Sequence, residues 1–239
     1  MPTPFTRSLI NRTIDAAHDL LAQRGISLPA YGYWRPEQWR DRGAEADEIR
    51  HCHLGWDVTD FASGDFQRIG RCLFTLRNGT PPGGHAAKHY AEKLIIDPEG
   101  QRAPPHFHRS KIEDIINRQG GNLLVALTAS DAAGLPDPMQ PVRVQVDGLT
   151  REVHGGQTIR LAPGQSLCIP PGTIHQFWGE PGTGTTISGE VSSVSDDHAD
   201  NAFIGAYRRF PTIIEDEPAR WLLCNEYPVA GCATQQAAG

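Results

Sequence analysis

The chain has 239 residues, of which 38% are hydrophobic and 21% charged, an ordinary composition for a globular protein with a sizeable core. Its net charge of −6, with lysines and arginines scattered along the sequence, argues against a nucleic-acid-binding surface. No apolar run approaches the roughly 18 residues of a membrane span, and the first residues lack the apolar core of a signal peptide. Five cysteines without CxxC spacing are typical of reduced thiols, so we expect a cytoplasmic protein with no nucleic-acid or membrane partner.

Two helices are predicted near the N-terminus. Residues 4–24 have the pattern of an amphipathic helix, and Gly25 follows as a stop signal. The apolar residues at helical spacing are Ile10, Ile14, Ala17 and Leu21. A second, short helix is predicted at residues 36–42, because proline is well tolerated in the first turn of a helix.

From residue 53 onward the pattern changes to short strands separated by clusters of turn residues. The predicted strands cover residues 55–61, 70–77, 92–97, 122–128, 142–146, 158–161, 167–169 and 185–194. Such strands, at spacings of roughly 8 to 12 residues, indicate a mainly β protein, either a β-sandwich or a jelly-roll barrel. The spacing alone does not choose between these two architectures.

Two histidines in the middle of the chain, His106 and His108, are spaced as neighbours on one face of a strand. Glu113 follows five residues later and can add a carboxylate oxygen if the chain bends after the strand. His-x-His by itself is a weak signal. The same pattern occurs at His51 and His53 without a carboxylate at comparable spacing, and we expect that pair not to bind a metal.

A second stretch, about sixty residues further on, reads Gly164-Gln-Ser-Leu-Cys-Ile-Pro-Pro-Gly-Thr-Ile-His175-Gln-Phe-Trp-Gly179. Together the two stretches resemble the two signature motifs of the cupin superfamily. The first motif is Gly, five residues, His-x-His, four residues, Glu, six residues, Gly, and it matches at every position. The second matches except at its end, where Gly179 stands in place of Asn and can serve in the same turn.

The cupin resemblance selects the jelly roll and adds His175 as the fourth metal ligand beside His106, His108 and Glu113. The expected fold is therefore a mainly β cupin jelly-roll β-barrel with an N-terminal helical extension. We assign residues 1–50 to the extension, which packs on the barrel or on a partner subunit. Residues 51–228 form the barrel and residues 229–239 a mobile tail.

Three imidazole nitrogens and one carboxylate oxygen suit a divalent Mn, Fe, Co, Ni or Zn ion and match Ca or Mg poorly. An octahedral ion with four protein ligands keeps two adjacent positions for water or a bidentate ligand such as a sugar. Some cupins have lost their metal and only bind or pack. Because all four ligand positions are present in this chain, we expect a bound metal.

Two further residues are candidates for catalysis. Lys111 lies between His108 and Glu113, where its ammonium group could polarise a substrate oxygen or move a proton; the alternative is a solvated surface lysine. Glu190 lies in a predicted strand after the second motif. Burial of its carboxylate there predicts a raised pKa, which would suit a base.

Three residues are candidates for substrate binding. Asp197 and Asp200 belong to a polar cluster after the last predicted strand that could bind sugar hydroxyls, although a solvated loop explains the same cluster equally well. Lys93 lies on the strand that leads into the first motif and is a weaker candidate.

Several segments resemble the D-lyxose isomerase family of cupins. They include Ala91-Glu-Lys-Leu-Ile-Ile, Lys111-Ile-Glu-Asp-Ile, Asp196-Asp-His-Ala-Asp-Asn201 and Arg209-Phe-Pro, and in order they span nearly the whole chain. Ala202 departs from the pattern where a basic residue is expected, which puts one substrate contact in doubt. The resemblance implies a Mn²⁺-dependent homodimer whose small-molecule substrate is a sugar. It also implies interconversion of D-lyxose with D-xylulose and often of D-mannose with D-fructose.

In such an enzyme Lys111 and Glu190 would move the protons, with the individual steps unassigned. A metal-assisted hydride shift is a competing mechanism that sequence does not exclude. Two other functions also remain open at this point. One is an Fe²⁺-dependent cupin oxygenase, which uses a similar set of ligands. The other is a non-catalytic sugar-binding cupin.

Overall fold

The computed structural model describes residues 3–80, 84, 87–196 and 199–230. The helices of the described chain all lie before residue 52, and all but the first are short: α1 (Arg7–Gln23), η1 (Ala30–Tyr33), α2 (Pro36–Arg40), η2 (Ala44–Ala46) and α3 (Asp47–His51). Both helices expected from the sequence are present, α1 with the predicted apolar face buried and α2 ending two residues early. Over the described residues, no helix is long and apolar enough to cross a membrane.

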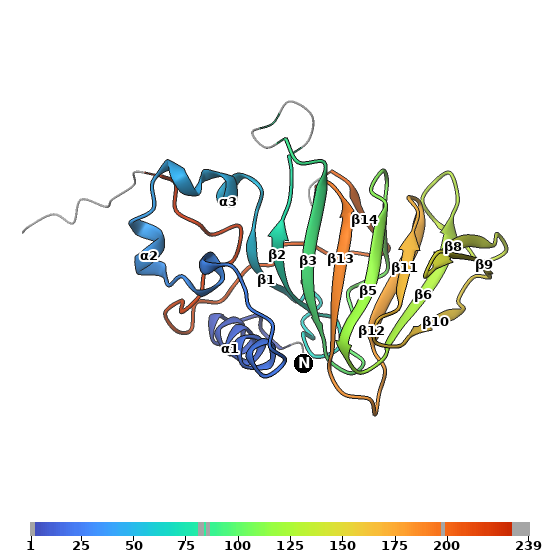
Figure 1. Ribbon diagram of the computed structural model, residues 1–239, viewed down its shortest axis with the longest axis horizontal. Helices are drawn as coiled ribbons and strands as arrows, with labels where there is room; N and C mark the ends of the chain where they lie inside the picture. The colour runs from blue at the N-terminus through green and yellow to red at the C-terminus, as the bar shows by residue number, and fades with distance from the viewer. Residues whose placement is uncertain (1–2, 81–83, 85–86, 197–198, 231–239) are drawn as a thin grey trace, which may run out of the picture.

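Fourteen strands follow the helices in the described chain. They are β1 (Gly55–Thr59), β2 (Arg71–Arg77), β3 (Tyr90–Asp97), β4 (His106–His108), β5 (Glu113–Gly120), β6 (Leu123–Ser130), β7 (Pro136–Asp137), β8 (Val142–Val146), β9 (Leu149–Val153), β10 (Thr158–Leu161), β11 (Ser166–Ile169), β12 (Thr173–Gly179), β13 (Thr186–Ser193) and β14 (Asn201–Phe203). One sheet has the order β1-β2-β3-β13-β5-β11-β8-β9, and the other has the order β10-β6-β12-β4-β14, with β7 paired to β6. The mainly β jelly roll with an N-terminal helical extension is confirmed (Figure 1).

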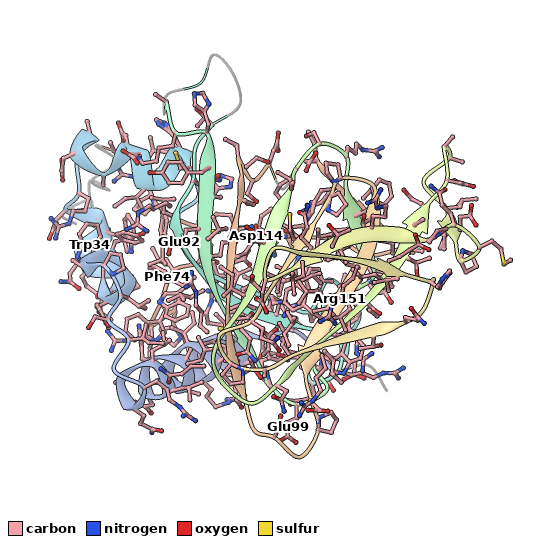
Figure 2. The ribbon with its side chains drawn as sticks, turned by 45° about the vertical axis from the view of Figure 1, so that its right-hand side comes forward. Trp34, Phe74, Glu92, Glu99, Asp114 and Arg151 are labelled. Atoms are coloured by element: carbon pink, nitrogen blue, oxygen red, sulfur yellow. The ribbon has the colours of Figure 1, made fainter. Side chains whose placement is uncertain are left out.

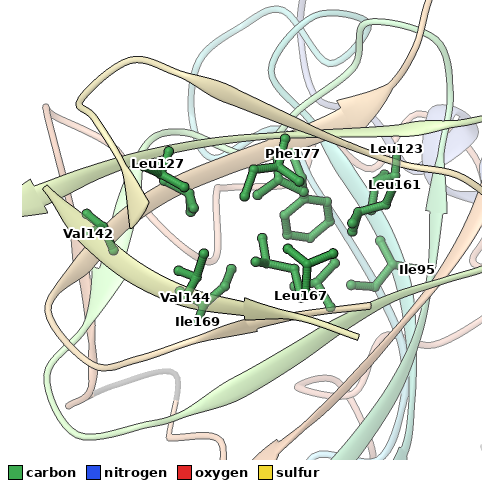
Figure 3. Packing of buried hydrophobic residues seen from close by; sticks show 14 of the residues in the cluster. Ile95, Leu123, Leu127, Val142, Val144, Leu161, Leu167, Ile169 and Phe177 are labelled. Carbon is green, nitrogen blue, oxygen red and sulfur yellow. The ribbon is translucent and has the colours of Figure 1, made fainter. Parts of the chain in front are cut away.

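The core of the barrel lies between the two sheets. Its apolar side chains alternate along each strand with residues that face outward, as in β6, where every second residue is buried. Figure 3 shows these side chains meeting around Phe177, with Leu167 and Ile169 of β11 facing Leu123 and Leu127 of β6. This packing fills one part of the barrel, and a cavity lined by both polar and apolar side chains lies beside it.

Removal of a core side chain is expected to cost stability in proportion to the cavity that remains. Leu167 is fully buried, so Leu167→Ala should lower the free energy of unfolding by about 2–5 kcal/mol. Leu149, on β9 of the same sheet, is 66% exposed and provides a matched control: Leu149→Ala should change the value by no more than about 0.5 kcal/mol. Urea denaturation followed by circular dichroism measures both. Equal losses for the two variants would contradict this assignment of the core.

The N-terminal helices cover the outer face of β1, β2 and β3. Phe74 of β2 stacks with Tyr31 and meets Trp56 edge-on, and α1 adds Ile10 and Ile14 to the same cluster. Figure 2 shows Phe74 between the sheet and the helical region, in which Trp34 lies. Strands β1 and β2 are therefore buried on both faces.

The segment after β14 returns to the helical region, as the orange and red trace in Figure 1 shows. Arg7 of α1 is buried and forms ion pairs with Glu215 and Glu226. Asn11 donates a hydrogen bond to Glu217 at 2.6 Å. Both ends of the described chain therefore contribute to one helical layer. The division into residues 1–50, 51–228 and 229–239 remains a prediction, and the tail lies outside the described residues from residue 231 onward.

Candidate active site

A cavity of about 60 Å³, open to solvent, lies between the two sheets at the end of the barrel that the apolar core does not fill. The six-stranded sheet contributes the three histidines His106, His108 and His175. The other charged groups on its walls are Arg71, Lys93, Lys111, Glu113, Glu190 and Arg209. Aromatic rings of Phe61, Phe177 and Phe203 complete much of the lining.

The three histidines converge because two neighbouring strands carry them. His106 and His108 lie on β4, and His175 on β12 is paired directly with His106. One nitrogen atom of each ring lies within 4.8 Å of the others, which is the spacing of a metal site. The turn before β12 is attached to this strand pair, since the N–H of Gly172 (φ +74°) donates to the carbonyl of His108 at 2.8 Å.

Backbone contacts determine which ring nitrogen faces the cavity. Nδ1 of His106 lies 2.9 Å from the carbonyl oxygen of Pro104, and Nδ1 of His175 lies 2.9 Å from that of Thr173. A carbonyl only accepts hydrogen bonds, so each Nδ1 carries a proton and leaves the Nε2 lone pair for a metal. Burial, together with the two neighbouring rings, lowers the pKa of His106 well below its usual range, which keeps this ring neutral.

Glu113 opens β5 in the facing sheet and points its carboxylate at the histidines. Its Oε1 lies 2.9 Å from Nε2 of His175 and its Oε2 lies 3.3 Å from Nε2 of His108. Oε1 of Glu113 and Nε2 of His175 are buried, yet neither has a hydrogen-bond partner among the described residues. Buried polar atoms are rarely left unpaired, so these contacts fit a divalent ion held by His106, His108, His175 and Glu113.

A chain of buried ion pairs runs from the histidines into the cavity. Nζ of Lys111 lies 2.7 Å from Oε2 of Glu113 and 2.7 Å from Oε1 of Glu190. Nζ of Lys93 lies 3.2 Å from the same Oε1 of Glu190 and donates to Ser195 at 2.8 Å. Lys111 is only 3% exposed, so the alternative of a solvated surface lysine is wrong.

These contacts decide the charges of the two catalytic candidates. Burial raises the pKa of Glu190, but the ammonium groups of Lys111 and Lys93 outweigh it and bring the value to about 2. Burial lowers the pKa of Lys111, but Glu113 and Glu190 outweigh it and raise the value above its usual range. The raised pKa expected for Glu190 from burial is therefore wrong, because Lys93 on the neighbouring strand and Lys111 in the loop before β5 supply two cations. Both groups are charged at neutral pH.

Asp200 does not line the cavity. Its Oδ1 accepts hydrogen bonds from the backbone N–H and the hydroxyl of Ser110 at 2.8 and 2.7 Å, and its Oδ2 lies 3.6 Å from Nδ1 of His108. These contacts favour a role in positioning His108 and the loop that carries Lys111. The substrate-binding role of Asp200 remains a prediction. Asp197 lies outside the described residues.

Removal of the Asp200 charge is expected to weaken metal binding without removing a ligand. Residues that contact a metal ligand and fix its orientation typically contribute 10- to 100-fold to metal affinity. Asp200→Asn should therefore raise the Kd for Mn²⁺ by about that factor. Asp131→Asn is a matched control, because Asp131 also accepts backbone N–H groups but belongs to another loop, the one after β6. Isothermal titration calorimetry of the metal-free proteins measures both. An unchanged Kd for Asp200→Asn would contradict the positioning role.

The structure adds residues to the site that the sequence patterns did not single out. Arg71 of β2 and Arg209, which follows the last strand, both line the cavity and form ion pairs with Asp97 and Asp57 respectively. Arg71 belongs to no motif with a defined spacing, whereas Arg209 belongs to the segment Arg209-Phe-Pro of the family resemblance, which assigned it no role in the site. The structure also explains why glycine occupies position 179, the one departure from the second motif. A Cβ at this position would lie 2.7 Å from the carbonyl oxygen of Asp97.

Known proteins with related sequences are sugar isomerases. A sequence model of the family described as D-lyxose isomerase matches residues 5–227. A D-lyxose/D-mannose isomerase of Serratia proteamaculans is 44% identical over 222 residues, which cover 92% of this chain and 96% of the relative. One from Escherichia coli O157:H7 is 43% identical over 222 residues, which cover 92% and 97%.

Solved structures of L-ribose isomerases share the fold. The enzyme of Acinetobacter sp. DL28 in complex with L-ribose matches with a TM-score of 0.59 at 16% identity, over 89% of this chain and 99% of its own. That of Cellulomonas parahominis with no ligand matches with a TM-score of 0.57 at 18% identity, over 90% and 100%. At these identities the likeness concerns the fold alone.

Proposed function

Since the chain belongs to the D-lyxose isomerase family and is an aldose–ketose isomerase, we propose that its substrates are D-lyxose and D-mannose. The products are then the corresponding ketoses, D-xylulose and D-fructose. The single observation that best supports this chemistry is the buried chain Glu113–Lys111–Glu190 beside three converging histidines. In the proposed complex, this chain of ion pairs would hold a carboxylate and an ammonium group next to the sugar carbonyl.

The proposed metal site consists of His106, His108, His175 and Glu113, and we infer that Mn²⁺ occupies it. A divalent ion held there supplies Lewis acidity, which polarises the carbonyl and neighbouring hydroxyl oxygens of an open-chain sugar. The soft thiolate ligands that would select other metals are absent from the described cavity lining.

Glu190 is proposed to carry the proton between C2 and C1. Its Oε1 accepts hydrogen bonds from Lys111 and Ser192, and Lys93 lies 3.2 Å away. Oε2 has a longer contact, 3.4 Å to Lys93, so it is the oxygen with capacity for a substrate proton. With a pKa of about 2 the carboxylate is ionised before the sugar binds, as a proton acceptor requires.

Lys111 is proposed to act on the sugar oxygens. Its ammonium group lies between Glu113 and Glu190 and remains protonated, so it can donate a hydrogen bond to O1 or O2 while Glu190 takes the carbon-bound proton. The positive charge also stabilises negative charge that develops on these oxygens. The two residues thus divide the work, with Glu190 as base and Lys111 as donor.

The proposal is tested by incubating the chelated and then Mn²⁺-reconstituted protein with D-lyxose, D-mannose, L-ribose and D-glucose. Ketose should form from D-lyxose and D-mannose and depend on the added metal. Formation of no ketose from any sugar, with metal shown to be bound, would overturn the proposal, and oxygen uptake with bound iron would favour an oxygenase. The same incubation in D₂O should place deuterium at C1 of the ketose if a proton transfer is used.

The remaining expectations from the sequence are part of this proposal. A cytoplasmic location agrees with Cys52, Cys72 and Cys168 being free thiols. The homodimer is inferred from the family resemblance, and analytical ultracentrifugation of the metal-loaded protein tests it: a species of twice the 26.2 kDa chain mass is expected.

A further inference from the structure

Arg71 is a buried cation on the cavity wall that the proposed chemistry does not use. It lies at the start of β2 and is only 5% exposed. Its guanidinium forms an ion pair with Asp97 on the neighbouring β3, and Asp97 in turn accepts a hydrogen bond from Ser188 of β13 at 2.5 Å. Three adjacent strands therefore hold this arginine in place.

Only one of the two terminal nitrogen atoms of the Arg71 guanidinium has a hydrogen-bond partner among the described residues. Nη1 donates to Asp97, whereas Nη2 is buried and has no hydrogen-bond partner in the part of the chain that the structure describes. The guanidinium carbon lies over the ring of Phe177, 4.2 Å from its centroid, a contact that helps to fix the position of the group. A buried charged donor without a partner is unfavourable, so Nη2 is available for a ligand in the cavity that Arg71 lines.

The strand register places Arg71 away from the reacting groups. Lys93 and Glu190 are direct partners across β3 and β13, and Thr75 of β2 lies in the same row. Asp97, the ion-pair partner of Arg71, lies four residues from Lys93 along β3, a distance of about 13 Å along the strand. Because every second residue of a strand lies on the same face, Lys93 and Asp97 both face the interior of the barrel. A sugar with C1 and C2 at Glu190 would extend its remaining carbons toward Arg71.

The charges of the cavity favour a neutral partner for Nη2. Each cation on the wall has its own carboxylate: Arg71 has Asp97, Arg209 has Asp57, and Lys93 and Lys111 share Glu190 and Glu113. Among the described side chains on the cavity wall, leaving the proposed metal ion aside, no surplus positive charge remains to hold a phosphate group. A hydroxyl oxygen, which accepts a hydrogen bond without bringing charge, fits this arrangement.

We propose that Nη2 of Arg71 donates a hydrogen bond to a hydroxyl group on C4 or C5 of the open-chain aldose, which makes Arg71 a residue that determines specificity. This inference rests on the function proposed above, because it takes the reacting end of the sugar to lie at Glu190. It assigns the far end of the cavity to unphosphorylated aldoses that carry these distal hydroxyls.

The experiment compares D-lyxose with 4-deoxy- and 5-deoxy-D-lyxose, using Mn²⁺-loaded wild type and Arg71→Lys. Lysine keeps a cation beside Asp97 but lacks the second Nη of the planar fork. For the wild type, kcat/KM should be about 10- to 100-fold lower on one deoxy sugar than on D-lyxose, as expected for loss of a hydrogen bond to a charged donor. Arg71→Lys should lose the same factor on D-lyxose and no longer discriminate against that deoxy sugar.

Arg102→Lys is the matched control, since Arg102 also lies over an aromatic ring, that of Trp178, but does not line the cavity. It should leave the ratio between the sugars unchanged. A wild type that treats all three sugars alike would overturn the inference, as would an Arg71→Lys variant that loses activity equally on all three. A higher kcat/KM for D-lyxose 5-phosphate than for D-lyxose would contradict the inference that Nη2 of Arg71 binds an uncharged hydroxyl group.

A failure of the proposed function is recognised separately. If the wild type does not isomerise D-lyxose, the Kd of D-arabinitol, a polyol that carries the same distal hydroxyls and cannot be isomerised, still tests Arg71. Calorimetry should show binding to Arg71→Lys weakened by the same factor of about 10 to 100. Equal Kd values for both proteins would overturn the inference even then.

Discussion

Replacement of Glu190 by glutamine is expected to lower kcat by about 100- to 10,000-fold, the usual contribution of a positioned general base. Glutamine has the same shape but cannot take a proton from C2, and it removes the negative charge that Lys111 and Lys93 share. Because the group acts on the reacting carbons, KM should change much less than kcat. Steady-state kinetics on D-lyxose, with the metal content of each preparation measured, gives both constants.

Glu180→Gln is the control for this substitution. Glu180 is also held by a cation and an amide, Arg160 and Asn122, but it lies in the turn after β12 and does not line the cavity. Its replacement should leave kcat unchanged. If Glu190→Gln retained full kcat while Lys111→Ala lost it, the base would have to be reassigned.

Replacement of His175 by glutamine is expected to abolish metal-dependent activity. Residues that only orient a metal ligand already contribute 10- to 100-fold to metal affinity. Loss of a ligand itself should therefore weaken Mn²⁺ binding by more than about 100-fold. The wild type should gain about 2.7 kcal/mol of stability at a metal concentration of 100 times Kd, and His175→Gln should gain almost none at that concentration. Metal analysis and thermal unfolding with and without Mn²⁺ measure these effects.

The other His-x-His pair provides the comparison. His51 ends α3, and His53 follows it in a turn with φ +50°, so the two do not share a strand face. Neither belongs to the group of three converging histidines found among the described residues. The double variant His51→Gln, His53→Gln should keep both metal content and activity. Loss of metal from this variant would mean that the site is elsewhere than on β4, β5 and β12.

The candidate metal ligands could be predicted from the sequence because their spacing is local. His106 and His108 share a strand face, Glu113 follows after a short loop, and His175 lies on β12, three residues after a Pro-Pro-Gly turn. Each spacing can therefore be read from a short stretch of sequence. The strand periodicity was equally informative: seven of the fourteen strands begin within one residue of their predicted starts, and β13, expected to run from residue 185 to 194, covers Thr186–Ser193.

What could not be predicted depends on pairing between distant strands. The pKa of Glu190 is lowered because the register of β13 on β3 places Lys93 directly opposite it, 97 residues away in sequence. Arg71 and Asp97 likewise meet only through the pairing of β2 with β3. Strand β5 was missed for another reason: Asn117 is fully buried in it, hydrogen-bonded to the carbonyls of Gly121 and Leu161, and interrupts the apolar alternation.

The helical layer has a consequence for the order in which the molecule is assembled. Arg7 is paired with Glu215 and Glu226, residues 208 and 219 positions later. During synthesis α1 emerges first, yet the carboxylates that neutralise its buried guanidinium are made last. The barrel can form from its own strands before that, whereas α1 has to wait for the final segment, which is the kind of long-range closure that slows folding. We therefore expect the first helix made by the ribosome to be among the last to reach its native position.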